Sequence, residues 1–265
     1  MLFTEEKSQG FCESLIWSPE YVNVITSFSM LFFSLLGIFL NRTHNLLIIT
    51  VFSNLFVNFI GSFGFHYSLY QGWGLIDTIS MLISAYFGMF TIWIIILESI
   101  LSRFLLFIVS SFMIVITNFL LVLSLADRCL DNFIGFNTVI AFPFIMIIVG
   151  AVAEIILFSI KGVEKRVVHY LITGVVMVFL SSLIWLLTEP FCYTHDNRIA
   201  YTFSHGFWHV FVSYGFYIIA VCNIYIHGFN RRNRSDLEYT FINTGFFKMF
   251  PRCIYEVNSS KTVQM

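Results

Sequence analysis

The sequence predicts an all-α membrane protein: a seven-transmembrane helix bundle with a lumenal or extracellular N-terminus and a cytosolic C-terminus. Three observations predict this fold class. Hydrophobic residues make up 58% of the 265 residues and charged residues only 11%, which leaves too little polar surface for a water-soluble globule. Apolar runs of membrane-spanning length recur along the chain. Basic residues gather on one side of the resulting spans.

The apolar runs define the spans in order. A helix crosses the hydrocarbon core with roughly 20 residues, and the runs of that length lie at about 22–40, 46–69, 75–97, 104–125, 135–158, 167–188 and 204–227. The breaks between them carry turn residues and charges, and none is long enough for a separate domain. We therefore expect a lumenal N-terminal segment (1–21), a seven-span domain (22–228) and a cytosolic tail (229–265). Residues 1–20 show no pattern of a cleavable signal peptide.

The distribution of the 14 Lys and Arg residues sets the orientation. With the N-terminus outside, only Lys7, Arg128 and Arg198 fall on the lumenal side. The others fall on the cytosolic side, at Arg42, Arg103, Lys161, Lys165, Arg166, Arg231, Arg232, Arg234, Lys248, Arg252 and Lys261. A formal net charge of -1 lacks the excess of positive charge that a nucleic-acid partner requires.

Five polar residues of three spans fall at one depth in this arrangement. His66 lies in the last turn of the second span, and Ser62 lies one turn deeper on the same helix face. Asp77 lies in the first turn of the third span, while His205 and His209 lie in the first two turns of the seventh. All of these turns lie at the lumenal boundary, so the five side chains can share one site.

Three histidines with an open fourth position form the ligand set of a catalytic zinc, which acidifies its bound water. A nearby carboxylate such as Asp77 could accept the water proton, and a hydroxyl such as Ser62 could stabilise a developing oxyanion. The alternative is that these are interfacial residues or hydrogen-bond partners between helices. Spacing and depth alone leave both interpretations open.

Three segments resemble the signature blocks of the alkaline ceramidases, seven-span membrane amidases within a superfamily that includes the adiponectin-receptor-like proteins. They are Gly61-Ser62-Phe63-Gly64-Phe65-His66, Leu75-Ile76-Asp77 and His205-Gly206-Phe207-Trp208-His209. The segment Phe11-Cys12-Glu13 and the following Ser18-Pro19 are similar to the family's amino-terminal region. The resemblance covers about residues 10–227.

The resemblance implies a site and a reaction. It assigns His66, His205 and His209 as zinc ligands, Asp77 as the base or water-orienting carboxylate, and Ser62 as the hydrogen-bond donor to the transition state. The implied reaction is hydrolysis of ceramide, an N-acyl sphingoid base, to a sphingoid base and a fatty acid. A membrane lipid is therefore the expected partner, and the endoplasmic reticulum or Golgi the expected location.

The chain also departs from the family pattern. Thr78 stands directly after Asp77, where the family carries a second acidic residue. The family's lumenal calcium site is reduced to Glu13, because Gly10 precedes Phe11-Cys12 and because Asn23 or Val24 falls where a further glutamate is expected. Calcium prefers six to eight oxygen ligands. We therefore expect an incomplete calcium site, with Glu13 as its remaining ligand.

Three cysteines, Cys12, Cys129 and Cys192, fall on the predicted lumenal side, where thiols can oxidise. The resemblance favours a disulfide between Cys12 and Cys192. Pairing with Cys129 is the competing arrangement, and three free thiols are the remaining one.

Two functional classes are consistent with the sequence. The first is a zinc-dependent amidase that acts on ceramide. The second is a seven-span lipid receptor or ligand-binding protein with a structural zinc and little turnover. The presence of Ser62 and Asp77, which a structural zinc does not require, favours the enzyme.

Overall fold

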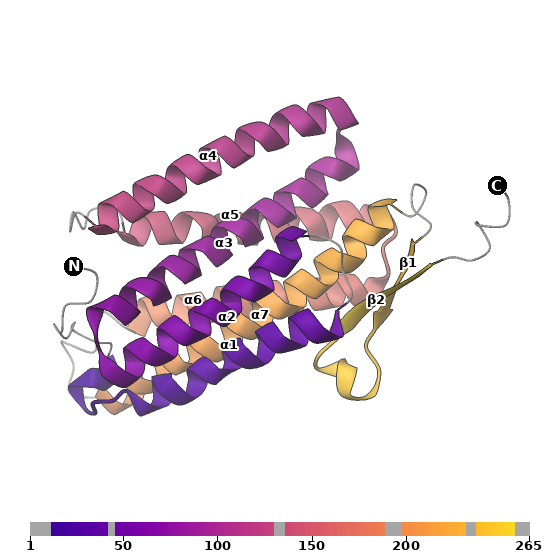
Figure 1. Cartoon of the computed structure of the whole chain (residues 1–265). Helices are drawn as coiled ribbons and strands as arrows, with labels where there is room; N and C mark the ends of the chain where they lie inside the picture. Colours follow the sequence, from indigo (N-terminus) through magenta and orange to yellow (C-terminus); the bar gives the residue numbers. More distant parts are fainter. Residues whose placement is uncertain (1–11, 42–45, 130–135, 189–197, 232–236, 258–265) are drawn as a thin grey trace, which may run out of the picture.

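The protein is a helical bundle with a small hairpin at one end (Figure 1). The computed structural model describes residues 12–41, 46–129, 136–188, 198–231 and 237–257. Short connections make consecutive helices run in opposite directions (Figure 1). The helices are α1 (Tyr21–Leu40), α2 (Leu46–Ser68), α3 (Gln71–Ile100), α4 (Arg103–Cys129), α5 (Phe136–Ile160), α6 (Lys165–Thr188) and α7 (Arg198–Arg231), preceded by a short 3-10 helix, η1 (Cys12–Leu15).

Helix α7 lies at the centre of the bundle. Residues 217–226 of this helix are all buried, a run that is apolar on every face apart from Asn223. A helix that is apolar all round is expected to pack on all sides, and α7 contacts α1, α2, α3 and α6. Helix α4 lies at the outer edge, against α3 and α5 (Figure 1).

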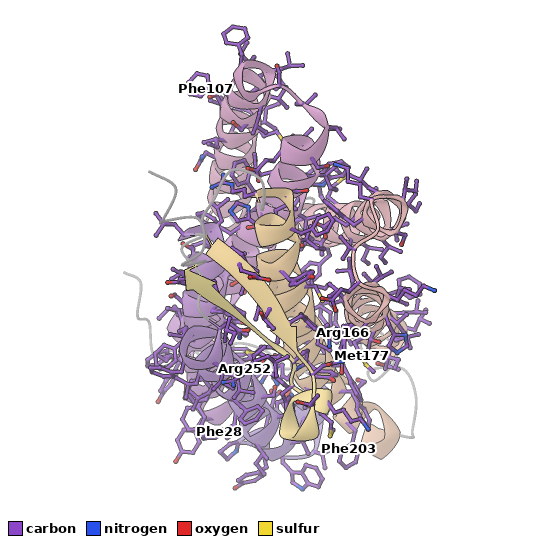
Figure 2. All side chains as sticks on the ribbon, turned by 90° about the vertical axis from the view of Figure 1, so that its right-hand side faces the viewer. Phe28, Phe107, Arg166, Met177, Phe203 and Arg252 are labelled. Carbon is purple, nitrogen blue, oxygen red and sulfur yellow. The ribbon has the colours of Figure 1, made fainter. Side chains whose placement is uncertain are left out.

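The outer surface of the bundle is apolar. Large side chains such as Phe28, Phe107 and Phe203 are exposed around its periphery (Figure 2). Six of the described helices are long and apolar enough to cross a membrane, which identifies a multi-pass membrane protein. The described apolar part of α4 is the shorter stretch Phe104–Ile116. The seventh span and the orientation in the membrane therefore stay predictions.

Helices α3 and α7 are longer than the spans expected from hydropathy, 75–97 and 204–227. The extra turns are polar, as at Gln71 and Arg231. A helix can extend past the hydrocarbon because its backbone hydrogen bonds do not depend on apolar side chains. Hydropathy therefore locates the hydrocarbon, while the helix ends lie beyond it.

Two glycines allow α6 and α7 to pack closely. A Cβ atom at Gly215 would lie 2.8 Å from the carbonyl oxygen of Gly174, and a Cβ at Gly174 would lie 3.1 Å from that of Gly215. Small residues at helix contacts are typical of membrane bundles because they let the backbones approach. This contact fixes α7 against α6.

The sequence analysis did not predict the β-hairpin that follows α7. Strand β1 (Leu237–Ile242) pairs antiparallel with β2 (Arg252–Val257), and a 3-10 helix, η3 (Gly245–Lys248), lies between them. Three tyrosine hydroxyls of the bundle donate hydrogen bonds to backbone carbonyls of the connecting segment. These pairs are Tyr170 to Lys248 at 2.6 Å, Tyr214 to Met249 at 2.8 Å, and Tyr217 to Pro251 at 2.6 Å. The hairpin is thus part of the packed structure.

Two glutamates inside the helices have partners on α7. The Glu98 carboxylate accepts from Arg231 Nε at 2.7 Å and lies 3.2 Å from His227 Nδ1. The buried Glu154 carboxylate lies 2.9 Å from the Asn223 amide nitrogen, in the amide orientation that satisfies both groups. Both glutamates therefore have structural partners within the bundle, away from His66, His205 and His209.

Candidate metal centre

Three buried histidines meet where α2 ends and α7 begins. Each of His66, His205 and His209 offers one ring nitrogen, and these nitrogens lie within 4.8 Å of one another. The ring centroids are 5.1 Å apart for His66 with either partner and 4.6 Å apart for the other two. Among the described residues this is the one group of three or more metal-ligating side chains, and it could hold a single ion. The predicted convergence of the three histidines is confirmed.

Helix geometry explains this convergence. His205 and His209 are one turn apart on the inner face of α7, so their rings meet edge to face, with an interplanar angle of 80°. His66 occupies the last turn of α2, which lies against the first turns of α7. Gly61 allows α3 to approach α2 at this level, since a Cβ atom there would lie 2.5 Å from the backbone nitrogen of Asp77. The site thus depends on close packing of three helices.

Asp77 lies on the wall of a cavity next to the histidines. Asn58 Nδ2 donates to Asp77 Oδ1 at 2.7 Å, to the Asp77 carbonyl at 3.0 Å and to Ser80 Oγ at 3.2 Å. Among the described residues, the second carboxylate oxygen of Asp77 takes part in no hydrogen bond. One oxygen is therefore held and the other can accept a proton. The sequence analysis missed Asn58, although its spacing of four residues from Ser62, and of eight from His66, places it on the same face of α2.

Ser62 is buried beside the histidines. Its Oγ lies 3.4 Å from His209 Nε2 and 3.1 Å from Ser27 Oγ. The Ser27 hydroxyl itself donates to the Asn23 carbonyl at 2.7 Å. The Ser62 hydroxyl thus lies within reach of His209 Nε2, and its role in catalysis stays a prediction.

Two side chains at the start of α1 contact the Nδ1 atoms of His66 and His209. The Thr26 hydroxyl donates to the Val22 carbonyl at 2.7 Å, so its oxygen is left to accept from His209 Nδ1 at 3.1 Å. Glu20 Oε2 lies 2.5 Å from His66 Nδ1, and both side chains are fully buried. Neither Glu20 nor Thr26 was found from the sequence, because neither belongs to a motif that spacing or hydropathy singles out.

Glu13 lies at the N-terminus of α1. Its two carboxylate oxygens accept hydrogen bonds from the backbone nitrogens of Val22 at 2.7 Å and Asn23 at 2.9 Å. Burial raises the pKa of the Glu13 carboxyl, and these two hydrogen bonds act in the opposite direction. The structure therefore gives Glu13 a capping contact, and calcium binding there stays a prediction.

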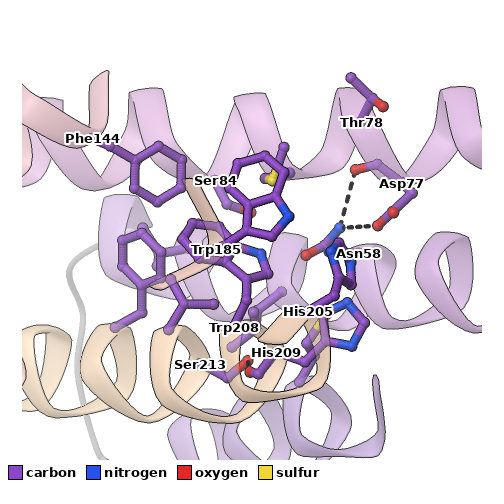
Figure 3. A pocket seen from close by; sticks show the side chains of 16 residues that line it. Asn58, Asp77, Thr78, Ser84, Phe144, Trp185, His205, Trp208, His209 and Ser213 are labelled. Atoms are coloured by element: carbon purple, nitrogen blue, oxygen red, sulfur yellow. Dashed lines mark hydrogen bonds between the residues drawn. The ribbon is translucent and has the colours of Figure 1, made fainter. Parts of the chain in front are cut away.

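A cavity of about 110 Å³ opens beside the histidines (Figure 3). His205, His209, Asp77, Thr78 and Asn58 lie on its polar side. The rest of the wall is largely apolar and includes Met30, Val51, Leu55, Met81, Phe144, Trp185, Trp208, Val212 and Phe216. A polar end and an apolar body suit an amphipathic ligand whose reactive group lies at the histidines.

The proposed disulfide cannot be placed. Cys192 lies outside the described residues, and the side chains of Cys12 and Cys129 lie outside the described part as well. The described cysteines Cys222 and Cys253 are buried free thiols. The pairing of Cys12 with Cys192 stays a prediction.

Fold and site together define a class: a multi-pass helical membrane protein with a buried three-histidine centre that opens into an apolar cavity. The comparison with family models is consistent with this class and sharpens it. The chain belongs to the Ceramidase family, whose model matches residues 10–253. This confirms the resemblance found in the sequence and implies a hydrolase that acts on an amide bond. A search of curated proteins gives no match.

Proposed function

We propose that the protein is a zinc-dependent membrane hydrolase that cleaves ceramide into a sphingoid base and a fatty acid. The observation that carries this proposal is the three-histidine group beside a cavity with a carboxylate on its wall, in a chain of the Ceramidase family. Asp77 matters most here, because a zinc that served only the fold would not require a carboxylate facing the cavity.

His66, His205 and His209 would hold the zinc ion. The donor set fits, since three neutral imidazoles leave a coordination position for water or substrate. When bound, zinc acidifies water and polarises a carbonyl group. The protein's own part is to bury the three imidazoles and to hold the Nδ1 atoms of His66 and His209.

Asp77 is the proposed base. Amide hydrolysis adds water across the C–N bond, so one proton leaves the water and one proton reaches the departing amine nitrogen. The free oxygen of Asp77 takes the first proton and can return it to the amine, while Asn58 holds the other oxygen. Ser62 is the proposed hydrogen-bond donor to the carbonyl oxygen as negative charge develops there.

The cavity would bind the substrate. A ceramide has two alkyl chains and an amide near the headgroup, and the apolar wall offers surface for a chain while the amide meets the polar end. Trp185 packs edge-on against His205 and also lies against Trp208 on the cavity wall (Figure 3). With the predicted orientation, this end of the bundle would face the lumen of the endoplasmic reticulum or Golgi.

The test is a turnover assay with purified protein and ceramides that differ in acyl chain and base. Release of sphingoid base by the wild type, its loss in Asp77→Asn with zinc retained, and loss of zinc in His209→Ala are expected. Zinc without turnover on any N-acyl or ester lipid would instead favour the receptor-like alternative, for which Thr78 in place of an acidic residue is the supporting observation.

Calcium binding at Glu13 is a separate proposal, which the resemblance to the family suggests. Both oxygens of its carboxylate already accept backbone hydrogen bonds. Calorimetric titration of the wild type and of Glu13→Gln with calcium tests it: the same heat from both proteins would exclude Glu13 as a ligand.

A further inference from the structure

We infer that Glu20 is a positioning residue of the metal centre, which holds His66 in the tautomer and orientation that bind the ion. This inference rests on the proposed function, because it assigns His66 as a zinc ligand. Glu20 belongs to α1, which supplies none of the three histidines.

Two contacts join Glu20 to His66. The carboxylate oxygen Oε2 lies 2.5 Å from the ring nitrogen Nδ1, and the backbone nitrogen of Glu20 donates to the His66 carbonyl at 3.0 Å. The first contact fixes the ring and the second fixes the backbone of the same residue. The pair therefore holds the end of α2 to the start of α1 and restricts rotation of the imidazole.

The Glu20 side chain does not cap the helix at whose N-terminus it lies. Glu20 is the N-cap residue of α1, yet its side chain makes no capping hydrogen bond. An N-cap side chain ordinarily accepts from the second or third backbone N–H of its own helix. Glu13 accepts those two hydrogen bonds instead, from Val22 and Asn23. One glutamate thus takes over the capping, and the other is left to contact the histidine.

The chemistry of imidazole gives this contact a consequence. A neutral imidazole carries its proton on one nitrogen, and the other nitrogen has the lone pair that binds a metal. The Glu20 carboxylate accepts a hydrogen bond from a protonated Nδ1, which leaves the lone pair of Nε2 of His66 to bind the metal. A carboxylate at this position also raises the basicity of the ligand nitrogen. Thr26 has the same relation to His209, since its hydroxyl oxygen accepts from Nδ1.

Burial supports a specific role for the charge. The Glu20 and His66 side chains are both fully buried. A buried carboxylate is costly unless it is paired and hydrogen-bonded. Besides His66, Asn23 Nδ2 donates to the same oxygen at 3.2 Å. Asn23 and the imidazole of His66 thus both contact Oε2.

The experiment measures metal binding by purified full-length protein rather than turnover. Zinc affinity is determined by competition with a chromophoric chelator, and the visible absorption of the cobalt-substituted protein reports the ligand geometry. The variants are Glu20→Gln, which keeps size and one acceptor oxygen but removes the charge, and Glu20→Ala, which removes both. Ser34→Ala is the control, because Ser34 is buried on the same helix but its hydroxyl donates to the Leu31 carbonyl.

Loss of the outer partner of a ligand histidine typically weakens metal binding about 10- to 100-fold. We expect about a tenfold weaker zinc affinity in Glu20→Gln, a larger loss with an altered cobalt spectrum in Glu20→Ala, and wild-type values in Ser34→Ala. Wild-type zinc affinity in folded Glu20→Gln overturns the inference, even where Glu20→Ala does not fold. A wild-type protein that binds no zinc would refute the proposed function itself, whereas equal binding by wild type and variant refutes only the role of Glu20.

Discussion

Replacement of Asn58 by leucine should slow hydrolysis while zinc stays bound. Leucine keeps the size of the side chain but removes the amide that donates to Asp77 Oδ1 at 2.7 Å. A hydrogen bond to a charged group contributes about 1.5–3 kcal/mol. Since about 1.4 kcal/mol corresponds to a tenfold change in rate, we expect kcat/KM to fall about 10- to 100-fold.

The assay follows release of sphingoid base by purified variants of equal zinc content. Asn118→Leu is the matched control, because Asn118 lies exposed on α4 and its amide donates only to the Ile114 carbonyl of its own helix. A folded, zinc-loaded Asn58→Leu protein with the wild-type rate would refute the reasoning that Asn58 holds the base. Loss of zinc from the same variant would show instead that Asn58 acts through the metal.

Three further predictions concern packing, the hairpin and the metal. Gly61→Ala places a Cβ atom 2.5 Å from the Asp77 nitrogen, so stability should fall by about 1–3 kcal/mol and turnover with it. Gly88→Ala, whose Cβ would make ordinary contacts with the Ile147 side chain at 3.5 Å and the Phe216 side chain at 3.8 Å, should melt and react as the wild type does. Tyr217→Phe leaves a buried carbonyl without its 2.6 Å hydrogen bond and should lower stability by about 1–3 kcal/mol in thermal unfolding, with an unchanged midpoint as the contrary result. Chelation of zinc should abolish turnover and added zinc restore it, whereas activity in zinc-free protein would contradict the proposed mechanism.

The sequence predicted the histidine group because two simple regularities suffice for it. His205 and His209 share a helix face through their spacing, and the alternation of spans places His66 at the same depth. Both regularities follow from helix geometry and bilayer thickness, which do not depend on details of packing. The shared depth of the three residues could therefore be derived before any contact was known, whereas their assignment as metal ligands came from the resemblance to the alkaline ceramidases.

The partners of these residues could not be derived in the same way. The contact of Glu20 with His66 exists because Glu13, seven residues earlier in the chain, caps α1 in its place. Capping by Glu13 instead of Glu20 depends on the contact between η1 and the start of α1. The periodic spacing of residues in the sequence does not predict a contact of this kind. Asn58 is a different case, because its spacing from Ser62 was visible and only its partner Asp77 was not.

The hairpin was missed for a third reason. Its strands are short, and a 3-10 helix rather than a two-residue turn joins them. Much of its stabilisation comes from contacts with the bundle, as Phe250 packs against Phe32, Phe33 and Tyr214. A segment that is held by distant aromatic residues carries little local signal of its own.

The contact between the hairpin and α1 has a consequence for the order of synthesis. The Asn41 side-chain oxygen, just after α1, accepts from the backbone nitrogen of Cys253 at 2.8 Å, across 212 residues of sequence. Helix α1 therefore receives this partner only after the other six helices and strand β1 have been made. A nascent chain that stops after α7 would contain every helix of the bundle and still lack the carbonyls that Tyr170, Tyr214 and Tyr217 bind. The end of the bundle that carries the hairpin is therefore completed only after α7 and both strands have been made.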